Sequence, residues 1–199
     1  MMRFGLACIA ALLVAGCSTS TGITKPAEIS SSASPLASTT VSSRSPVSST
    51  LTVPHPPPNQ WNDGTSYDPC LMYTAEQIRS WGVDPTRVSD RGVEDRQLRG
   101  CRWASDGWSL ELSVANTKVS TYLDPGKFTN AHPVDIAGLA GAMYQGSVPQ
   151  LPVCTVILPA EQATVAVVVV IADPKNSSLS DPCAKATEVA TVVAPTLPK

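Results

Sequence analysis

VAVVVVI, at residues 165–171, is the stretch of the chain that decides its fold. The surrounding segment, 163–172, lacks the alternation of apolar and polar side chains that marks a strand with one face in water. A strand that is apolar on both faces belongs in the middle of a sheet, covered on each side. At about ten residues, the segment is too short to cross a membrane as a helix, which needs roughly twenty. We therefore predict a central strand here, paired with 153–158 across a turn at 159–162.

Segments before this strand pair supply further strands. Asp106-Gly107 is a dipeptide typical of two-residue hairpin turns, and it separates segment 101–104 from segment 108–114. The second of these alternates apolar and polar side chains, so one of its faces is buried. The Gly- and Ala-rich segment 134–144 suits one more strand, at a place where backbones pack closely.

Two helices are predicted at the ends of the domain. Thr74 and Gln77 have the spacing of a capping box, in which each side chain bonds the backbone N–H of the other residue, and Gly82 ends that helix. Asp181-Pro182 opens a second helix that continues over 184–194. The predicted fold is α+β: a mostly antiparallel sheet of about five strands with the N-terminal and C-terminal helices packed on one face.

Charged residues alternate in sign over 83–99, which predicts a solvated surface loop with local ion pairs. The arginines of this loop, together with Arg102, are also candidates to bind an anionic ligand, but the interspersed carboxylates cancel most of their field. The whole chain has a net charge of −2 and no long run of Lys or Arg. We therefore expect no nucleic acid among its partners.

The N-terminus has the pattern of a bacterial lipoprotein signal peptide. A mostly apolar segment, 4–15, leads into Val14-Ala15-Gly16-Cys17. Its length of about twelve residues suits the core of a signal peptide and not a spanning helix. We predict that residues 1–16 are removed and that Cys17 carries diacylglycerol with chains such as palmitate, which anchors the protein to the outer face of the cell membrane. An ordinary secretory signal with an incidental cysteine is the alternative.

Export places the remaining cysteines in an oxidising compartment. Cys8 leaves with the signal peptide, so Cys70, Cys101, Cys154 and Cys183 remain for two disulfides. Of the three possible connectivities, we expect Cys70 with Cys101 and Cys154 with Cys183, since each closes a loop of about thirty residues. The alternative is a zinc site, but no pair has the close C-x-x-C spacing of metal knuckles. We expect no metal and no cofactor.

Residues 17–60 differ in composition from the rest of the chain. They are rich in Ser, Thr and Pro and end in prolines at 54–58. So few large apolar side chains cannot offset the entropy of ordering, which predicts a disordered tether with a span on the order of 35 Å. Its clustered hydroxyls suit O-glycosylation. All tryptophans and tyrosines lie from Trp61 onward, so the folded domain is placed at 61–199.

Candidate catalytic residues are few. His55 falls in the predicted tether and His132 in a predicted loop. The sequence has no nucleophile elbow, no phosphate-binding glycine loop and no zinc-protease motif. We therefore expect that the protein is not an enzyme. An envelope hydrolase with an unfamiliar site stays open as an alternative, and it would need His132 to converge with Asp and Ser side chains.

A few spaced elements connect the chain with a known group of proteins. They are an Asp-Pro-Cys helix start at 68–70, the Cys101-Arg102-Trp103 element, and a third and fourth cysteine that open a strand and a helix. With the signal peptide and tether, this pattern resembles the small lipoproteins of mycobacteria and related actinobacteria that share a secreted domain of unknown function. The resemblance covers about 67–194. It implies a cell-envelope location and a binding or accessory role, and it carries no catalytic residue across.

The expected function is that of a membrane-anchored, non-catalytic module that binds an envelope protein or a small hydrophobic ligand. Trp103 and Trp108 are the candidate binding face. A lipid or glycolipid carrier is the alternative, in which the Gly- and Ala-rich segment and the valine strand line an apolar cavity.

Overall fold

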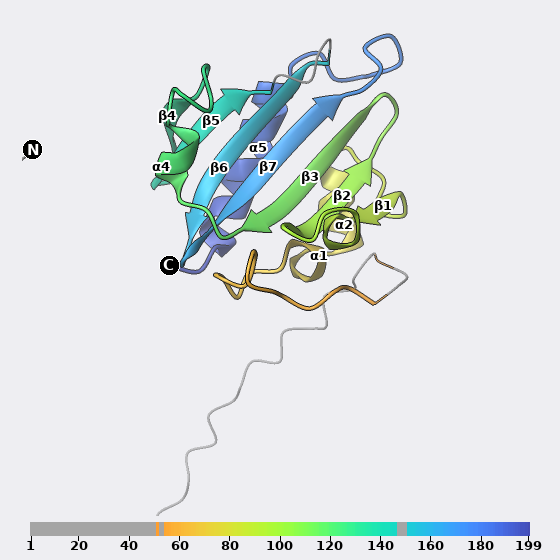
Figure 1. Cartoon of the computed structure of the whole chain (residues 1–199). Helices are drawn as coiled ribbons and strands as arrows, with labels where there is room; N and C mark the ends of the chain where they lie inside the picture. The colour runs from red at the N-terminus through yellow and green to blue at the C-terminus, as the bar shows by residue number, and fades with distance from the viewer. Residues whose placement is uncertain (1–50, 52–53, 147–150) are drawn as a thin grey trace, which may run out of the picture. The chain divides into compact units, whose positions relative to one another are not determined.

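The computed structural model describes residues 51, 54–146 and 151–199. The predicted signal peptide, Cys17 and the tether as far as residue 50 lie outside these residues. Within them, one antiparallel sheet has the strand order β1-β2-β3-β7-β6-β5-β4 (Figure 1). The strands are β1 (Val88–Asp90), β2 (Arg99–Ala104), β3 (Trp108–Ala115), β4 (His132–Ile136), β5 (Leu139–Gln145), β6 (Val153–Ala160) and β7 (Ala163–Ile171).

The sheet has seven strands and not the five that were predicted. Segment 134–144 is not one strand but the hairpin β4–β5, because Ala137 and Gly138 both take positive φ angles, 51° and 84°, in a tight turn. The second additional strand is β1, which lies within the predicted surface loop and pairs with β2. β1 and β4 are the edges of the sheet, and Pro133 of β4 lacks the N–H that a further strand would need.

β7 is the central strand, as the valine run predicts, with β3 and β6 as its neighbours. Val165, Val167, Val169 and Ile171 point to one face of the sheet and are buried. The alternate residues at 166, 168 and 170 point to the opposite face, where they are half-buried. We call this second face the open face. The valine run predicted that both faces of β7 are covered. One face is fully buried as predicted, and the other is only half-buried.

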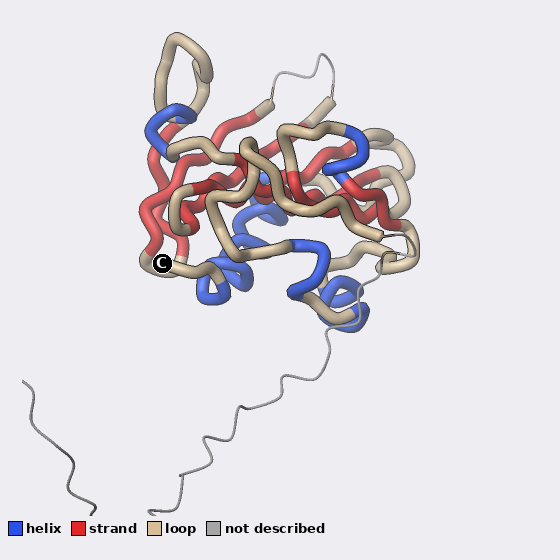
Figure 2. Tube along the Cα trace, turned by 60° about the horizontal axis from the view of Figure 1, so that its bottom comes forward, coloured by secondary structure: helices blue, strands red, loops and turns tan. Residues whose placement is uncertain are grey.

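The longest helix covers the buried face. α5 lies behind the sheet in Figure 1, against β6 and β7, and most helical segments lie on the same side in the turned view of Figure 2. Its buried residues Ala186, Val189, Ala190 and Val193 join the valines of β7 in the core. The helices are α1 (Pro69–Met72), α2 (Ala75–Ser80), α3 (Arg91–Glu94), α4 (Val119–Tyr122), α5 (Pro182–Val193) and the 3₁₀ helix η1 (Ala194–Thr196).

Two disulfides fasten helices to the sheet, and their pairing confirms the prediction. Cys70–Cys101 joins α1 to β2, and Cys154–Cys183 joins β6 to α5. In the chain-entropy description, closing loops of this length stabilises the fold by about 3–4 kcal/mol each. The predicted capping box of α2 is also present.

Helix lengths bear on how the described residues could meet a membrane. Among residues 51, 54–146 and 151–199, no helix is both long enough and apolar enough to span one.

Candidate functional site

The two tryptophans predicted as a binding face lie in the core. Trp103 is 0% exposed and Trp108 is 4% exposed. Trp103 packs edge-on against Trp81, which packs edge-on against Tyr73, so these rings fill the space between the sheet and the N-terminal helices. The prediction is wrong because both side chains point to the helix-covered face, where Trp103 is opposite Leu110 and Trp108 is opposite Ile171.

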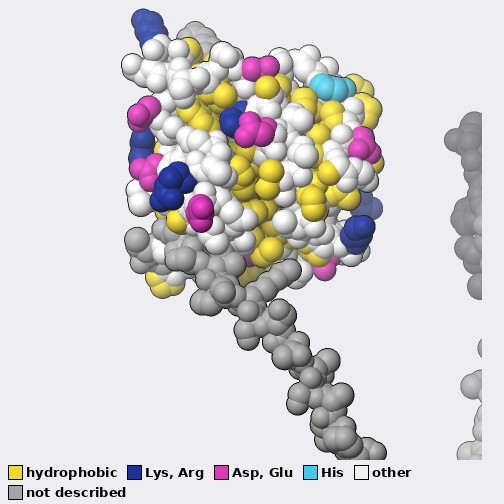
Figure 3. Space-filling model, turned by 180° about the vertical axis from the view of Figure 1, so that it is seen from behind, with side chains coloured by type: hydrophobic (Ala, Val, Ile, Leu, Met, Phe, Trp, Pro, Cys, Tyr) yellow, Lys and Arg dark blue, Asp and Glu magenta, His cyan; other side chains and the backbone are white. Residues whose placement is uncertain are grey.

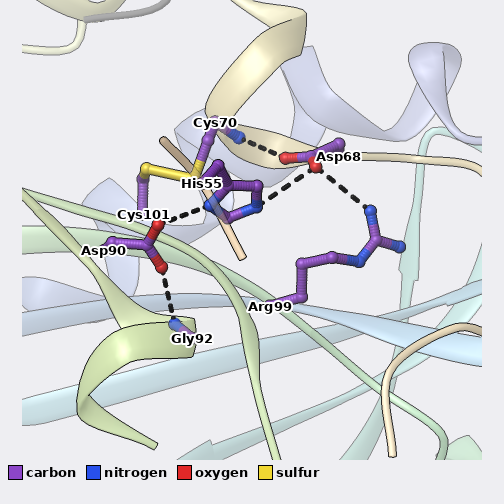
Figure 4. Close-up of a disulfide and its surroundings, with 7 residues drawn as sticks. All are labelled: His55, Asp68, Cys70, Asp90, Gly92, Arg99 and Cys101. Atoms are coloured by element: carbon purple, nitrogen blue, oxygen red, sulfur yellow. Dashed lines mark hydrogen bonds and ion pairs between the residues drawn. A yellow bond between two sulfur atoms is a disulfide. The ribbon is translucent and has the colours of Figure 1, made fainter. Parts of the chain in front are cut away.

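His55 is part of the folded domain and not of a disordered tether. Its Nδ1 lies 2.5 Å from Asp90 Oδ2, and its Nε2 lies 3.2 Å from Asp68 Oδ2 (Figure 4). The side chain is only 11% exposed. The residues before it also contribute, because Leu51 packs partly buried against the core. The domain therefore begins before Trp61, the boundary that composition predicted.

Each carboxylate of this cluster also begins a helix. Asp68 accepts a hydrogen bond from Cys70 N at 3.0 Å and pairs with Arg99 at 3.3 Å. Asp90 accepts from Gly92 N at 2.7 Å, at the start of α3. We call His55 with these two aspartates the His55 clamp. It lies beside the Cys70–Cys101 disulfide, so the N-terminal segment, α1, α3 and β2 meet at one place (Figure 4).

The His55 clamp holds distant segments of the chain together. Each ring nitrogen of His55 faces a carboxylate, so no nitrogen remains to act as a base toward a substrate. His55, Asp68 and Cys70 place three potential metal-ligating atoms within 4.8 Å of one another. Cys70 is bonded to Cys101, however, and a disulfide sulfur is not a thiolate ligand. What remains is a mostly buried imidazole ring held between two carboxylates.

His132, the other candidate base, lies at the exposed start of β4. Its Nδ1 is 3.5 Å from the carbonyl oxygen of Asn130, and it forms no ion pair with a described carboxylate. Within residues 54–146 and 151–199, no ion pair or hydrogen bond joins it to an acidic or hydroxyl side chain, as a hydrolase site would require.

A second polar cluster occupies the open face, with Glu111 of β3 at its centre. Glu111 Oε2 lies 2.9 Å from Arg91 Nε and 3.3 Å from Arg102 Nη2, and Oε1 accepts a hydrogen bond from Ser113 Oγ at 2.9 Å. Glu94 pairs with both arginines. Opposite charges alternate through the cluster, so it is closed on itself and nearly neutral.

The arginines of segment 83–99 are therefore not all solvated. The Arg91 side chain is 15% exposed and that of Arg99 is 3% exposed. Arg99 donates to the carbonyl oxygens of Asn62 and Thr65 at 3.2 and 2.7 Å. The prediction of a solvated loop is wrong here, because the segment contains β1 and α3 and leads into β2.

Strand register extends the Glu111 cluster into a row across the open face. Cross-strand partners place side chains of five neighbouring strands side by side: Arg102, Glu111, Val168, Thr155 and Tyr144. We call these five residues the open-face row. Burial raises the pKa of Tyr144, and the nearby Tyr122 and Glu111 raise it further, while a hydrogen bond with Thr155 acts in the opposite direction.

An aromatic cluster ends the row. Tyr122 of α4 stacks on Tyr144 with a centroid distance of 6.1 Å, and Phe128 lies 4.9 Å from Tyr144. Beside it is a hollow of about 160 Å³, lined by Phe128, Tyr144, Asn130, Gln145 and neighbouring residues. This juxtaposition could not be predicted from sequence spacing, because Tyr122 and Tyr144 meet only when α4 packs against β5.

Comparison with known proteins gives a family but no function. A family model described as "Protein of unknown function (DUF3558)" matches residues 12–196. No curated protein and no solved structure matches the chain. The matched region includes Cys17 and both disulfides, and it extends beyond the segment on which the sequence resemblance rests.

Proposed function

The chain belongs to this family of proteins of unknown function, and on that premise we propose that it is a lipid-anchored lipoprotein of the cell envelope whose domain binds a partner without catalysis. The signal-peptide pattern that ends at Cys17 supports the anchor, and the family match begins before that residue. The two disulfides are consistent with export to an oxidising compartment.

The observation that carries the binding role is the difference between the two faces of the sheet. α5 and the disulfide Cys154–Cys183 close one face. In the open-face row on the other side, Arg102, Val168 and Tyr144 are half-buried, and the charged Glu111 and the hydroxyl of Thr155 are buried between them, next to half-buried positions of β7. A rigid sheet that presents a few fixed polar groups among apolar ones has the composition of a binding surface.

The carrier alternative receives less support. The valines that it would place around a cavity pack against α5 in the core, where Val167 and Ala186 are both 0% exposed. Ala142 of the Gly- and Ala-rich segment is also 0% exposed. These side chains fill the space in which a lipid chain would have to lie.

The anchor is tested by acylation. Cells that express the full chain are fed an alkyne analogue of palmitate, and the label on the purified protein is measured. We expect label on the wild type and on Cys8→Ser, and none on Cys17→Ser. Label on all three chains, or on none, would reject the anchor.

The binding role is tested by site-specific photocrosslinking of the full chain in envelope membranes. A photoreactive residue is placed at Ser109, half-buried on the open face, and in a control chain at Val192, which is 48% exposed on α5. α5 lies behind the sheet in Figure 1, and the view from behind in Figure 3 shows hydrophobic side chains between charges of both signs. We expect a discrete crosslinked product from position 109 and none from position 192. The same products from both positions, or none from either, would reject the open face as a binding surface.

A further inference from the structure

Trp61 differs from the other three tryptophans of the chain. Its residue is 52% exposed, whereas Trp81, Trp103 and Trp108 are 3%, 0% and 4% exposed. Its ring has no aromatic partner among the described residues. An indole combines a large apolar ring with an N–H donor. A half-exposed indole is therefore typical of surfaces that bind another molecule or lie at a membrane–water interface.

The backbone that carries Trp61 is fixed in place. Asn116, which follows β3, donates from its backbone N to Trp61 O at 2.7 Å and from Nδ2 to Gln60 O at 2.9 Å. Asn59 Oδ1 accepts a hydrogen bond from Trp61 N at 3.0 Å. The indole is therefore presented from a rigid turn and not from a loose chain end.

Arg96 stands beside this turn. Its carbonyl oxygen accepts from Asn59 Nδ2 at 3.0 Å and from Asn62 Nδ2 at 3.3 Å, which holds its backbone against the turn. Its guanidinium forms no ion pair with any residue of the described part of the chain, unlike those of Arg91, Arg99 and Arg102. Asn59, Gln60, Trp61 and Arg96 together line a shallow hollow of about 300 Å³. We call it the Trp61 hollow.

We propose that the Trp61 hollow binds a phospholipid headgroup of the membrane that carries the anchor, so that the domain rests on that membrane. Guanidinium groups bind phosphate through paired N–H donors. Indole rings prefer the headgroup region of a bilayer, where the ring is shielded and the N–H stays hydrated. The Gln60 side chain adds an amide donor and acceptor for the remaining headgroup atoms, whereas the Asn59 amide is engaged within the turn.

The position of Trp61 in the chain favours a membrane over a soluble partner as the ligand of the Trp61 hollow. This step rests on the proposed anchor at Cys17. Trp61 comes shortly after Pro54, where the continuous described domain begins. The tether that composition predicts after Cys17 would span on the order of 35 Å. Such a link gives an effective concentration on the order of millimolar. A single weak headgroup site would then be occupied, although it would not bind a membrane by itself.

Two carboxylates close in sequence to the hollow bear on the kind of membrane contact to expect. Asp63 and Asp95, both exposed and acidic, flank Trp61 and Arg96 in the sequence. They offset the field of the single guanidinium, so long-range attraction to an anionic surface does not drive the contact. The contact should therefore form on zwitterionic phosphatidylcholine and change little with salt.

Fluorescence can test this proposal because only one tryptophan is exposed. The full lipidated chain is reconstituted into phosphatidylcholine vesicles that contain a lipid with a quencher near the headgroup, and vesicle-bound protein is isolated by flotation. We expect lipid quenching of tryptophan emission, together with protection of that emission from acrylamide in the aqueous phase. Trp61→Phe should remove both effects, and Arg96→Gln should weaken them. Arg79→Gln, an exposed arginine on α2, is the matched control and should change neither.

The headgroup contact is also measured without the anchor, in the chain from residue 17 with Cys17→Ser and millimolar dihexanoyl-phosphatidylcholine. A saturable shift of the emission that Trp61→Phe lacks is expected. Inorganic phosphate at the same concentration should give no shift, since it cannot contact the indole.

A lipidated chain that does not float rejects the anchor. A floated chain whose Trp61 stays open to acrylamide, or a short-chain lipid that gives no shift, overturns the headgroup site. Protection of Trp61 only after envelope proteins are added would assign the hollow to a protein partner and overturn it as well.

Discussion

His55 Nδ1 lies 2.5 Å from Asp90 Oδ2, although the two residues are 35 positions apart in the sequence. The other ring nitrogen faces Asp68 at the start of α1. The beginning of the domain is therefore held by an imidazole ring that lies between two carboxylates and is mostly out of water.

His55→Gln is expected to lower the free energy of unfolding by roughly 1–3 kcal/mol, because the buried Asp90 carboxylate would lose its imidazole partner. His132→Gln is the matched control. That residue is exposed and forms no ion pair with a described residue, so its replacement should cost less than about 0.5 kcal/mol. Urea unfolding followed by tryptophan fluorescence measures both variants. Equal midpoints for the two would show that the His55 clamp contributes nothing to stability.

His55 also shows where the sequence stops predicting the structure. Its neighbours are prolines and the segment before it is rich in Ser and Thr, so local composition assigned it to a disordered tether. Its two partners become visible only when β1 pairs with β2 and α1 is bonded to the same strand. Contacts between distant segments that depend on a few charges leave no periodic pattern in a sequence.

Features set by local spacing were predicted correctly. The central position of β7 follows from an unbroken apolar run, the α2 capping box from residues three apart, and the disulfides from loop lengths. The hairpin β4–β5 was missed because its turn uses Ala137 in a left-handed conformation, which an alanine rarely adopts. The open-face row depends on the register of five strands, and hydrophobic patterning fixes which face a side chain takes but not its cross-strand neighbours.

Truncation of Trp103 should destabilise the fold strongly, whereas truncation of Trp61 should have almost no effect on stability. Trp103→Ala would remove a fully buried ring from contact with Trp81, at a cost of about 3–5 kcal/mol. Trp61→Ala would remove a ring that is half in water and should change the free energy of unfolding by less than about 0.5 kcal/mol. Thermal unfolding monitored by circular dichroism measures both. A Trp103→Ala chain as stable as wild type would place that ring outside the core.

The buried tyrosines make the domain sensitive to alkali. Burial raises the pKa of Tyr67 well above its ordinary value, and the neighbouring Tyr73 adds to the rise. Burial also raises the pKa of Tyr73, although its hydrogen bonds to Thr196 and Tyr67 oppose the shift. The two phenol oxygens are 2.8 Å apart. The folded chain therefore holds protons that the unfolded chain releases at about pH 10, so stability falls as pH rises above that value.

Absorbance at 295 nm measures this effect. In the folded protein, the tyrosinate signal of Tyr67 and Tyr73 should appear only together with loss of the circular dichroism signal. Tyr67→Phe should move the alkaline unfolding transition to higher pH, provided that its stability at pH 7 is within about 1 kcal/mol of wild type. Ionisation of all tyrosines near pH 10 with the fold intact would contradict the buried pair.

Glu94 makes the open face sensitive to acid. Partial burial is the largest single influence and opposes its ionisation, but a hydrogen bond with Ser89 and the charges of Arg102 and Arg91 together lower the pKa of Glu94 below its ordinary value. A depressed carboxyl pKa stabilises the fold above the unfolded value, about pH 4.3, and the effect is lost as pH falls through the folded value. Glu94→Gln should therefore lower the melting temperature at pH 7, and the difference from wild type should shrink below about pH 4.

Glu76→Gln on α2, which removes an exposed carboxylate without a described ion pair, is the control that separates this effect from the general loss of a negative charge. If the two variants follow the same melting curve across this range, Glu94 does not stabilise the arginines beside Glu111.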